Sequence, residues 1–372
     1  MIVTSASSFL VRVPLSAPYV ISRGALDAFV NVVLRLESDE GVVGWGEAVP
    51  VSLTEDPAEF KRVIDECLLP ALLGQTIDSV ADTVDALLPL CEGHVATVAA
   101  VDLALWDMLG KARGVSVGQL LDGEPGRRTL IDYTMGALAP AEMAARALEV
   151  CEAGYSGVVV KITCKDLDED LARVRAVCTA LPTGRSIRVD ANAGFDRDTA
   201  RRFLDSIAGL PIEFLEQPVA AGDLAGMRAC RDCGVPIAAD ESLKVPGDAL
   251  ALVTEGACDV LNVKVTKAGG IAQSLRVARI AEAAGLPLVI GGGLTFGPSR
   301  FASQHIAAAT PATRGIAHQG PGPASQALTG DITLPRLTPA LMRETAGTVT
   351  APATPGLGFR IDAAALDRFR IA

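Results

Sequence analysis

From about residue 129 to residue 318, short apolar runs alternate with stretches of helical period. Strands that alternate with helices in this way are typical of parallel β-α-β units. The runs are Leu130–Met135, Val158–Lys161, Ile187–Asp190, Ile212–Glu216, Pro236–Asp240, Val260–Lys264 and Leu286–Gly291. With an eighth strand expected near Gly315–His318, their number is that of a TIM-like barrel. A doubly wound open sheet would need a glycine-rich phosphate turn after its first strand, and Met135-Gly136-Ala137 is not one.

The first 125 residues follow a different order, with strands before helices. Ala28–Glu37 is rich in β-branched residues and predicts a strand, Asp39-Glu40-Gly41 predicts a turn, and Val42–Ala48 predicts the partner strand. Pro57–Leu73 and Val95–Ala112 then show helical periodicity. This order indicates an α+β segment.

The chain of 372 residues is longer than one ordinary hydrophobic core supports. We therefore predict an α+β domain at residues 1–125 and a barrel domain at residues 126–335. Residues 336–372 are too few for a domain, and we expect them to pack back on the N-terminal one.

The charge of the chain limits the kinds of partner that it is expected to bind. Lys and Arg number 33 against 44 Asp and Glu, which gives a net charge of −11. This charge would repel a nucleic-acid backbone or an anionic membrane. No apolar run approaches the ~18 residues of a membrane helix, and no signal peptide is expected at the N-terminus. The eight cysteines are then expected to be reduced thiols in a cytoplasmic protein.

Five ionisable residues fall at the ends of successive apolar runs. They are Lys161, Asp190, Glu216, Asp240 and Lys264, at spacings of 29, 26, 24 and 24 residues. Each spacing is about one β-α unit, so all five are expected at the same ends of neighbouring strands. In a barrel this is the C-terminal mouth, where active sites lie.

Three carboxylates that face one mouth would repel one another unless a cation bound them. An all-oxygen ligand set suits Mg²⁺, or Mn²⁺, rather than zinc. We therefore predict Asp190, Glu216 and Asp240 as metal ligands, with Asn192 and Gln217 as supporting groups. For any one of these carboxylates, a solvated strand end is the alternative.

Lys161 and Lys264 follow strands on either side of the carboxylates. A bound metal and a nearby ammonium both lower the pKa of a lysine, so each can act as a base. A metal that holds a substrate carboxylate also stabilises the enediolate that forms when the α-proton leaves. We predict Lys161 and Lys264 as the catalytic pair. Lys165 and Lys267 are expected to be loop or helix-start lysines.

Several motifs occur together in a fixed order. They are Gly44-Trp45-Gly46-Glu47-Ala48, Asp102-Leu103-Ala104-Leu105-Trp106-Asp107, Lys161, Asp190-Ala191-Asn192, Glu216-Gln217-Pro218, Ala239-Asp240-Glu241-Ser242 and Asn262–Gly270. In these motifs the chain resembles the enolase superfamily and, within it, the muconate lactonizing enzyme subgroup. The likeness covers nearly the whole chain.

The resemblance implies a capping domain over a modified (β/α)7β barrel, completed by the C-terminal segment. It also implies Mg²⁺, abstraction of the proton α to a carboxylate, and a homo-oligomer. Loops near Pro18–Gly24 and Pro50–Asp56 in the cap are implied to help choose the substrate.

The chain departs from the family pattern at several positions. The subgroup usually has Lys-x-Lys on the second strand, and Val159 replaces the first lysine here. No acidic residue stands in Gly291-Gly292-Gly293-Leu294-Thr295-Phe296, where many cycloisomerases have one. The segment His318–Pro323 lacks the Asp-x-Asp with which dipeptide epimerases hold a free ammonium. Neither His94 nor His305 is expected to oppose Lys161, as a histidine does in mandelate racemase-like members.

These observations predict a Mg²⁺-dependent racemase or epimerase of an amino-acid derivative that uses both lysines on a small carboxylate substrate. A cycloisomerase, or a dehydratase that eliminates a β-hydroxyl group, could arise from the same intermediate. A Schiff-base aldolase barrel is a further alternative, with Lys161 or Lys264 as the nucleophile. It would leave the three carboxylates unexplained. A barrel that only binds or assembles is the non-enzymatic alternative.

Overall fold

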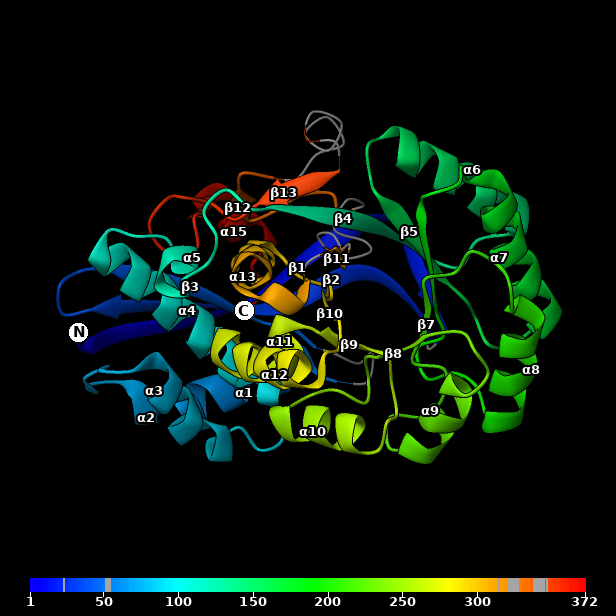
Figure 1. Ribbon diagram of the computed structural model, residues 1–372. Helices are drawn as coiled ribbons and strands as arrows, with labels where there is room; N and C mark the ends of the chain where they lie inside the picture. Colours follow the sequence, from blue (N-terminus) through cyan, green and yellow to red (C-terminus); the bar gives the residue numbers. More distant parts are fainter. Residues whose placement is uncertain are drawn as a thin grey trace.

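The computed structural model describes residues 1–22, 24–50, 55–313, 315–316, 318–319, 328–336, 345 and 347–372. Two parts lie side by side, a capping domain built around a twisted antiparallel sheet and a curled parallel sheet with helices outside it (Figure 1). The predicted turn at residues 39–41 joins two strands of the cap. The loops implied to choose the substrate fall partly outside the described residues, at position 23 and positions 51–54.

The barrel sheet contains the seven predicted strands and the eighth. Its strands are β4 (Arg128–Met135), β5 (Gly157–Lys161), β6 (Ser186–Asp190), β7 (Phe214–Glu216), β8 (Ile237–Ala239), β9 (Val260–Val263), β10 (Leu288–Ile290) and β11 (His318–Gln319). They pair in the order β10-β9-β8-β7-β6-β5-β4-β11, each parallel to its neighbours. The Ile290 amide donates to His318 Nδ1 at 3.0 Å and joins the two ends of this path. The open-sheet alternative is thereby excluded, and the TIM-like prediction is confirmed.

Helices connect these strands and cover the outside of the barrel (Figure 1). They are α6 (Pro140–Glu152), α7 (Leu167–Ala180), α8 (Arg197–Ile207), α9 (Leu224–Arg231), α10 (Pro246–Thr254), α11 (Val265–Ala268), α12 (Ile271–Ala284) and α13 (Gly297–Ala309), followed by the 3-10 turn η3 (Pro311–Thr313). Helix α8 illustrates how the sequence determines these helices. Its N-cap Asp196 accepts from the Thr199 amide at 2.7 Å, and Ala200, Phe203 and Ile207 bury one face at helical spacing.

The cap consists of a three-stranded antiparallel sheet and helices packed on it. The strands are β1 (Val3–Ile21), β2 (Gly24–Ser38) and β3 (Val43–Ala48). The helices are α1 (Pro57–Val63), η1 (Ile64–Leu68), α2 (Leu69–Leu72), α3 (Val80–Leu87), η2 (Leu88–Leu90), α4 (Val95–Arg113) and α5 (Val117–Leu120). Helix α4 lies so close to β3 that a Cβ at Gly46 would come within 1.8 Å of the Ala100 carbonyl oxygen. The glycines of the Gly-Trp-Gly-Glu motif therefore serve close packing.

The C-terminal segment contacts both parts. It contains β13 (Thr348–Thr350), β14 (Arg360–Ile361) and α15 (Ala363–Phe369), and β12 (Thr333–Leu334), just before it, pairs antiparallel with β14. The Leu10 amide of β1 donates to Ala372 O, and Ile371 N donates back to Leu10 O. Strand β13 instead pairs antiparallel with β4 of the barrel, a contact that the sequence pattern did not predict. Domain boundaries near residues 125 and 335 stay a prediction.

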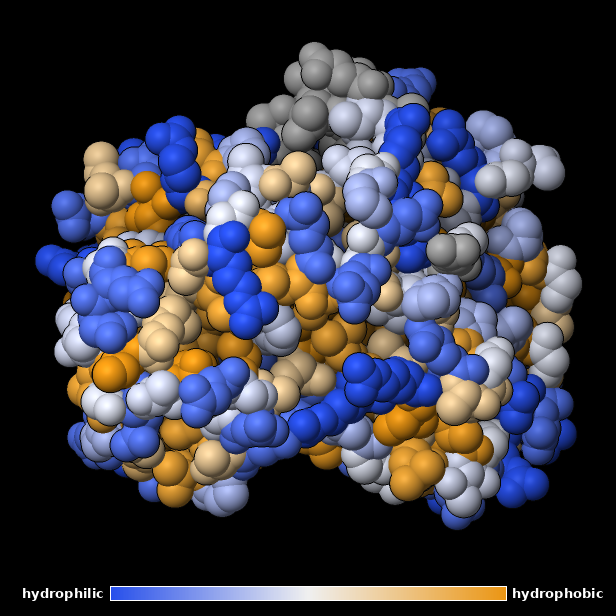
Figure 2. All heavy atoms as spheres, turned by 60° about the vertical axis from the view of Figure 1, so that its left-hand side comes forward, coloured by the Kyte–Doolittle hydropathy of each residue, from blue (hydrophilic) through white to orange (hydrophobic). Residues whose placement is uncertain are grey.

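Polar and apolar residues are interspersed over the molecular face shown in Figure 2. Within the described residues, no helix has the length and apolar character needed to span a membrane.

A buried carboxylate joins the cap to the barrel. Asp102 of α4 is fully buried and accepts from the amides of Ile271 at 2.6 Å and Ala272 at 3.2 Å, the first residues of α12. A helix N-terminus favours a negative partner. Gly270 leaves room for it, since a Cβ there would lie 2.3 Å from Asp102 Cγ. Burial, opposed by these two bonds, raises the pKa of Asp102 to about 7.

We predict that Asp102→Ala lowers the free energy of unfolding by about 2–4 kcal/mol, because two buried amides lose their acceptor. The pKa of Asp102 is about 7 when folded and ordinary when unfolded, so its contribution is full at low pH and falls as pH rises through 7. The penalty of Asp102→Ala should therefore be larger at pH 5 than at pH 8. Urea denaturation at both pH values measures it.

Asp367→Ala is the matched control, because Asp367 lies exposed on α15. It should change the unfolding free energy by less than about 0.5 kcal/mol. Equal effects of the two substitutions would contradict the role of Asp102.

Candidate active site

The five ionisable residues predicted at strand ends lie together at one end of the barrel. Lys161, Asp190 and Glu216 are the last residues of β5, β6 and β7, and they are direct neighbours in register. Asp240 and Lys264 come immediately after β8 and β9. Parallel pairing of successive strands thus converts a regular spacing in sequence into one cluster in space.

The three carboxylates of this cluster form a buried triad. One oxygen from each of Asp190, Glu216 and Asp240 can be chosen so that all three lie within 4.8 Å of one another. Burial raises the pKa of Glu216 well above its usual range, and the charges of Asp190 and Asp240 add to this effect. Oxygen ligands this close, with several negative charges, fit a hard divalent cation. The donor set therefore matches the predicted metal.

Lys161 lies on one side of the triad. Its buried ammonium donates to Asp190 and, at 3.0 Å, to Asn192 Oδ1. The backbone amide of Asn192 in turn donates to Asp190 Oδ1 at 2.7 Å. Burial alone would lower the pKa of Lys161, but the charges of Asp190 and Glu216 outweigh it and raise the pKa.

Lys264 lies on the other side, where its ammonium pairs with Asp240. Burial opposes its charge too, yet Asp240 and Glu216 raise its pKa. The carboxylates therefore stand between two ammonium groups in strand order, as the sequence spacing predicted. The lowering of both lysine pKa values that a bound metal is expected to cause stays a prediction.

Lys267 was expected to be a loop or helix-start lysine. It does lie in α11, but its side chain is buried and its ammonium donates to Oδ1 and the carbonyl oxygen of Asp240. Burial lowers its pKa. Helical spacing does not predict this contact, because Lys264 precedes α11 in extended backbone. Lys165 is exposed, as expected.

Amide side chains fix the carboxylates. Gln217 Oε1 accepts from the amides of Asp240 and Ser242, both at 3.0 Å, so Gln217 holds the turn after β8. The Asn262 side chain donates to Glu216 Oε1 at 2.9 Å, a contact that sequence reasoning missed. Glu241, the residue after Asp240, accepts from Asn192 Nδ2 at 3.2 Å.

The histidines take structural positions. His305 of α13 is buried, and its Nε2 lies 3.1 Å from the Leu357 carbonyl oxygen. His318 accepts from Ile290 in the barrel wall, and His94 is the residue before α4. In the described residues, no histidine contact with the triad is found, in line with the two-lysine pattern.

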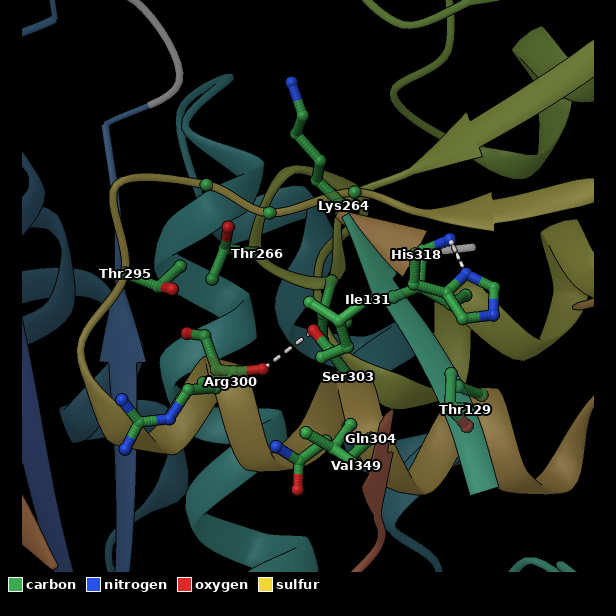
Figure 3. Close-up of a pocket in the computed structure, with 17 residues that line it drawn as sticks. Thr129, Ile131, Lys264, Thr266, Thr295, Arg300, Ser303, Gln304, His318 and Val349 are labelled. Atoms are coloured by element: carbon green, nitrogen blue, oxygen red, sulfur yellow. Dashed lines mark hydrogen bonds between the residues drawn. The ribbon is translucent and has the colours of Figure 1, made fainter. Parts of the chain in front are cut away.

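The loop after β10 forms one wall beside Lys264. Gly291 packs so tightly there that a Cβ would lie 2.8 Å from Lys264 Cγ and 2.3 Å from Asn262 Oδ1. A cavity of about 40 Å³ lies behind this loop, lined also by Thr266, Thr295 and Arg300. Figure 3 shows that the Lys264 ammonium points away from this cavity.

Comparison with known proteins agrees with this site and fold. The family model described as "Mandelate racemase / muconate lactonizing enzyme, N-terminal domain" matches residues 4–122, and "Enolase C-terminal domain-like" matches residues 142–365. The L-Ala-D/L-Glu epimerase of Bacillus subtilis is 33% identical over 80% of this chain and 82% of its own length. Muconate cycloisomerase 1 of Rhodococcus opacus is 31% identical over 83% of this chain and 84% of its own.

Among solved structures, the N-succinyl Arg/Lys racemase of Bacillus cereus superposes with a TM-score of 0.92 and 27% identity, over 100% of this chain and 99% of its own. The matches cover both the cap and the barrel, and they include racemases, epimerases and cycloisomerases. The chain therefore belongs to the enolase superfamily and, within it, to the muconate lactonizing enzyme-like group of isomerases that its strand-end motifs indicated.

Proposed function

We propose that the chain is a Mg²⁺-dependent racemase or epimerase of an amino-acid derivative. The observation that carries this proposal is the buried triad of Asp190, Glu216 and Asp240 with a lysine ammonium on each flank. One base alone would suffice for an elimination or a cyclisation. Two bases that face the same centre from opposite sides suit the removal of a proton from one face and its return to the other.

Asp190, Glu216 and Asp240 would hold the ion, Mg²⁺ or alternatively Mn²⁺. When bound, the ion would supply positive charge that orients the substrate carboxylate and stabilises the negative charge developing there as the α-proton leaves. Asn262 and Gln217 keep the ligands in place, through Glu216 Oε1 and the Asp240 amide.

Lys161 Nζ and Lys264 Nζ would exchange roles between the two directions of the reaction. The neutral amine takes the α-proton from its own face, and the opposing ammonium donates a proton to the other face. In the structure each ammonium pairs with one triad carboxylate, so each is anchored on its own side. Neither lysine has to move across the centre.

The proposed substrate is a small carboxylate with a blocked α-amino group. No Asp-x-Asp follows the last barrel strand to hold a free ammonium, although residues 320–323 lie outside the described part of the chain. By its name, the Bacillus cereus relative acts on N-succinyl arginine and lysine, which supports an N-acyl amino acid as the substrate class.

Cycloisomerisation is the second candidate, favoured by the similarity to Muconate cycloisomerase 1. The segment after β10 argues against it, because Gly291–Phe296 contains no acidic residue. Elimination of water from a hydroxy acid would need only one of the two lysines. A Schiff-base aldolase would leave the triad without a role. A homo-oligomer and a cytoplasmic location stay predictions.

If the triad holds the metal, Glu216→Gln should abolish α-proton exchange and weaken Mg²⁺ binding at least tenfold while the fold is kept. The reason is that one anionic ligand is lost from three. Isothermal titration with MgCl₂ and circular dichroism check both parts. Glu255→Gln, at an exposed glutamate, is the control. Full activity after thorough chelation would contradict the metal role.

Substitution of the two lysines should stop α-proton exchange with opposite enantiomers. Lys161→Ala should stop α-proton exchange with one enantiomer and Lys264→Ala with the other, because a base reaches only the hydrogen on its own side. Loss of a general base typically costs about 10²–10⁴-fold. Proton NMR in D₂O over N-acyl amino acids, proline analogues, dipeptides and muconates measures exchange and reveals ring formation or water loss.

Lys165→Ala, at an exposed lysine of the loop after β5, is the matched control and should leave both exchange rates unchanged. If both single variants lose exchange with the same enantiomer only, the opposed-base proposal is wrong and a one-base reaction replaces it.

A further inference from the structure

The loop after β10 lies beside the proposed base Lys264, and its glycines give its backbone unusual conformational freedom. Its sequence, Gly291-Gly292-Gly293-Leu294-Thr295-Phe296, begins with three glycines in a row. Glycine loses more conformational entropy on ordering than any other residue, so such a loop needs restraints to keep one conformation. The structure supplies a restraint at each end.

The barrel provides the first restraint. The Gly291 amide donates to Val263 O at 2.8 Å, directly before Lys264 in the neighbouring strand. Because a Cβ at Gly291 would lie 2.8 Å from Lys264 Cγ, the Gly291 backbone packs against the stem of this lysine. Any displacement of the loop therefore changes the packing of Lys264.

The cap provides the second restraint, through a pair of buried side chains. Asn31 of β2 donates from Nδ2 to Leu294 O and to Glu47 Oε1, both at 2.7 Å. Glu47 of β3 also accepts from the Phe296 amide at 2.7 Å and from the Ser299 hydroxyl at 2.9 Å. Asn31 is 1% exposed and Glu47 is fully buried, so water does not compete for these bonds.

Lys264 therefore lies between the carboxylate triad and the Gly291–Phe296 loop, which the cap holds through hydrogen bonds. In Figure 3 the lysine stem rises from its strand beside the glycine loop, and the ammonium extends beyond it, away from Thr295 and Arg300. Lys161 is held by a different set of contacts. Its ammonium bonds to Asp190 and Asn192, which both belong to the barrel.

We propose that Asn31 and Glu47 are positioning residues for one of the two bases. They hold the Gly291–Phe296 loop from the cap and thereby fix the side chain of Lys264, whereas the hydrogen bonds of the Lys161 ammonium stay within the barrel. This inference rests on the proposed function, because it assigns the cap a role in one direction of the proton transfer. A merely structural role would affect both directions equally.

The test compares Asn31→Ala with wild type in two measurements. Hydrogen–deuterium exchange followed by mass spectrometry should show faster amide exchange in peptides covering residues 288–300 and unchanged exchange around residues 155–165. In D₂O, α-proton exchange with the enantiomer that depends on Lys264 should fall at least tenfold, since small misplacements of a reacting group can cost about 10²-fold. Exchange with the other enantiomer should change less than threefold.

Two further variants serve as comparisons. Ser299→Ala removes only one hydroxyl donor to Glu47. It should lower exchange with the enantiomer that depends on Lys264 by a smaller factor than Asn31→Ala does. Asp102→Ala removes a different cap–barrel anchor, to α12, and should lower stability without favouring either enantiomer. An equal fall in both exchange reactions in Asn31→Ala, or unchanged amide exchange at residues 288–300, would overturn the proposal.

The first measurement needs no substrate, so it separates this inference from the proposed function. If wild type exchanges no α-proton at all, the proposed function fails. In that case faster amide exchange at residues 288–300 in Asn31→Ala still supports the cap restraint, and unchanged amide exchange still refutes it.

Discussion

Mutual repulsion among three buried carboxylates is the constraint on which the rest of the structure depends. Asp190, Glu216 and Asp240 come within 4.8 Å of one another where water is excluded. Such a group is stable only if positive charge is nearby. Three lysine ammonium groups and a divalent cation can supply it. The barrel presents Lys161 at the end of β5 and Lys264 and Lys267 after β9, on the two sides of the carboxylates. The lysines that we propose as catalytic bases thus also balance the charge of the triad.

The sequence predicted this cluster because a parallel barrel repeats in a simple way. One strand and one helix take about 25 residues, so charges at that spacing end on one rim of the barrel. Lys161, Asp190 and Glu216 follow this rule directly, and Asp240 and Lys264 lie one residue past their strands. What the spacing could not reveal are contacts that depend on side-chain direction, such as Lys267 with Asp240 and Asn262 with Glu216.

The junction between cap and barrel was also beyond the sequence pattern. Glu47 and Asp102 were recognised only as parts of family-like motifs. In the fold Glu47 bonds to an amide about 250 positions further along the chain, and Asp102 to one about 170 positions further along. No local periodicity encodes pairs so far apart. The pairing of β13 with β4 was missed for the same reason, because a three-residue strand far from its partner leaves little trace in the pattern.

The central claim is that the triad holds one divalent cation between two opposed lysines. Anomalous diffraction from crystals grown with MnCl₂ tests it most directly, because the scattering identifies the ion and its ligands at once. The account predicts a single strong peak within about 2.0–2.3 Å of Asp190, Glu216 and Asp240, with Lys161 and Lys264 on opposite sides. A peak bound by Glu241 in place of Asp240, or no peak at the triad, would contradict it.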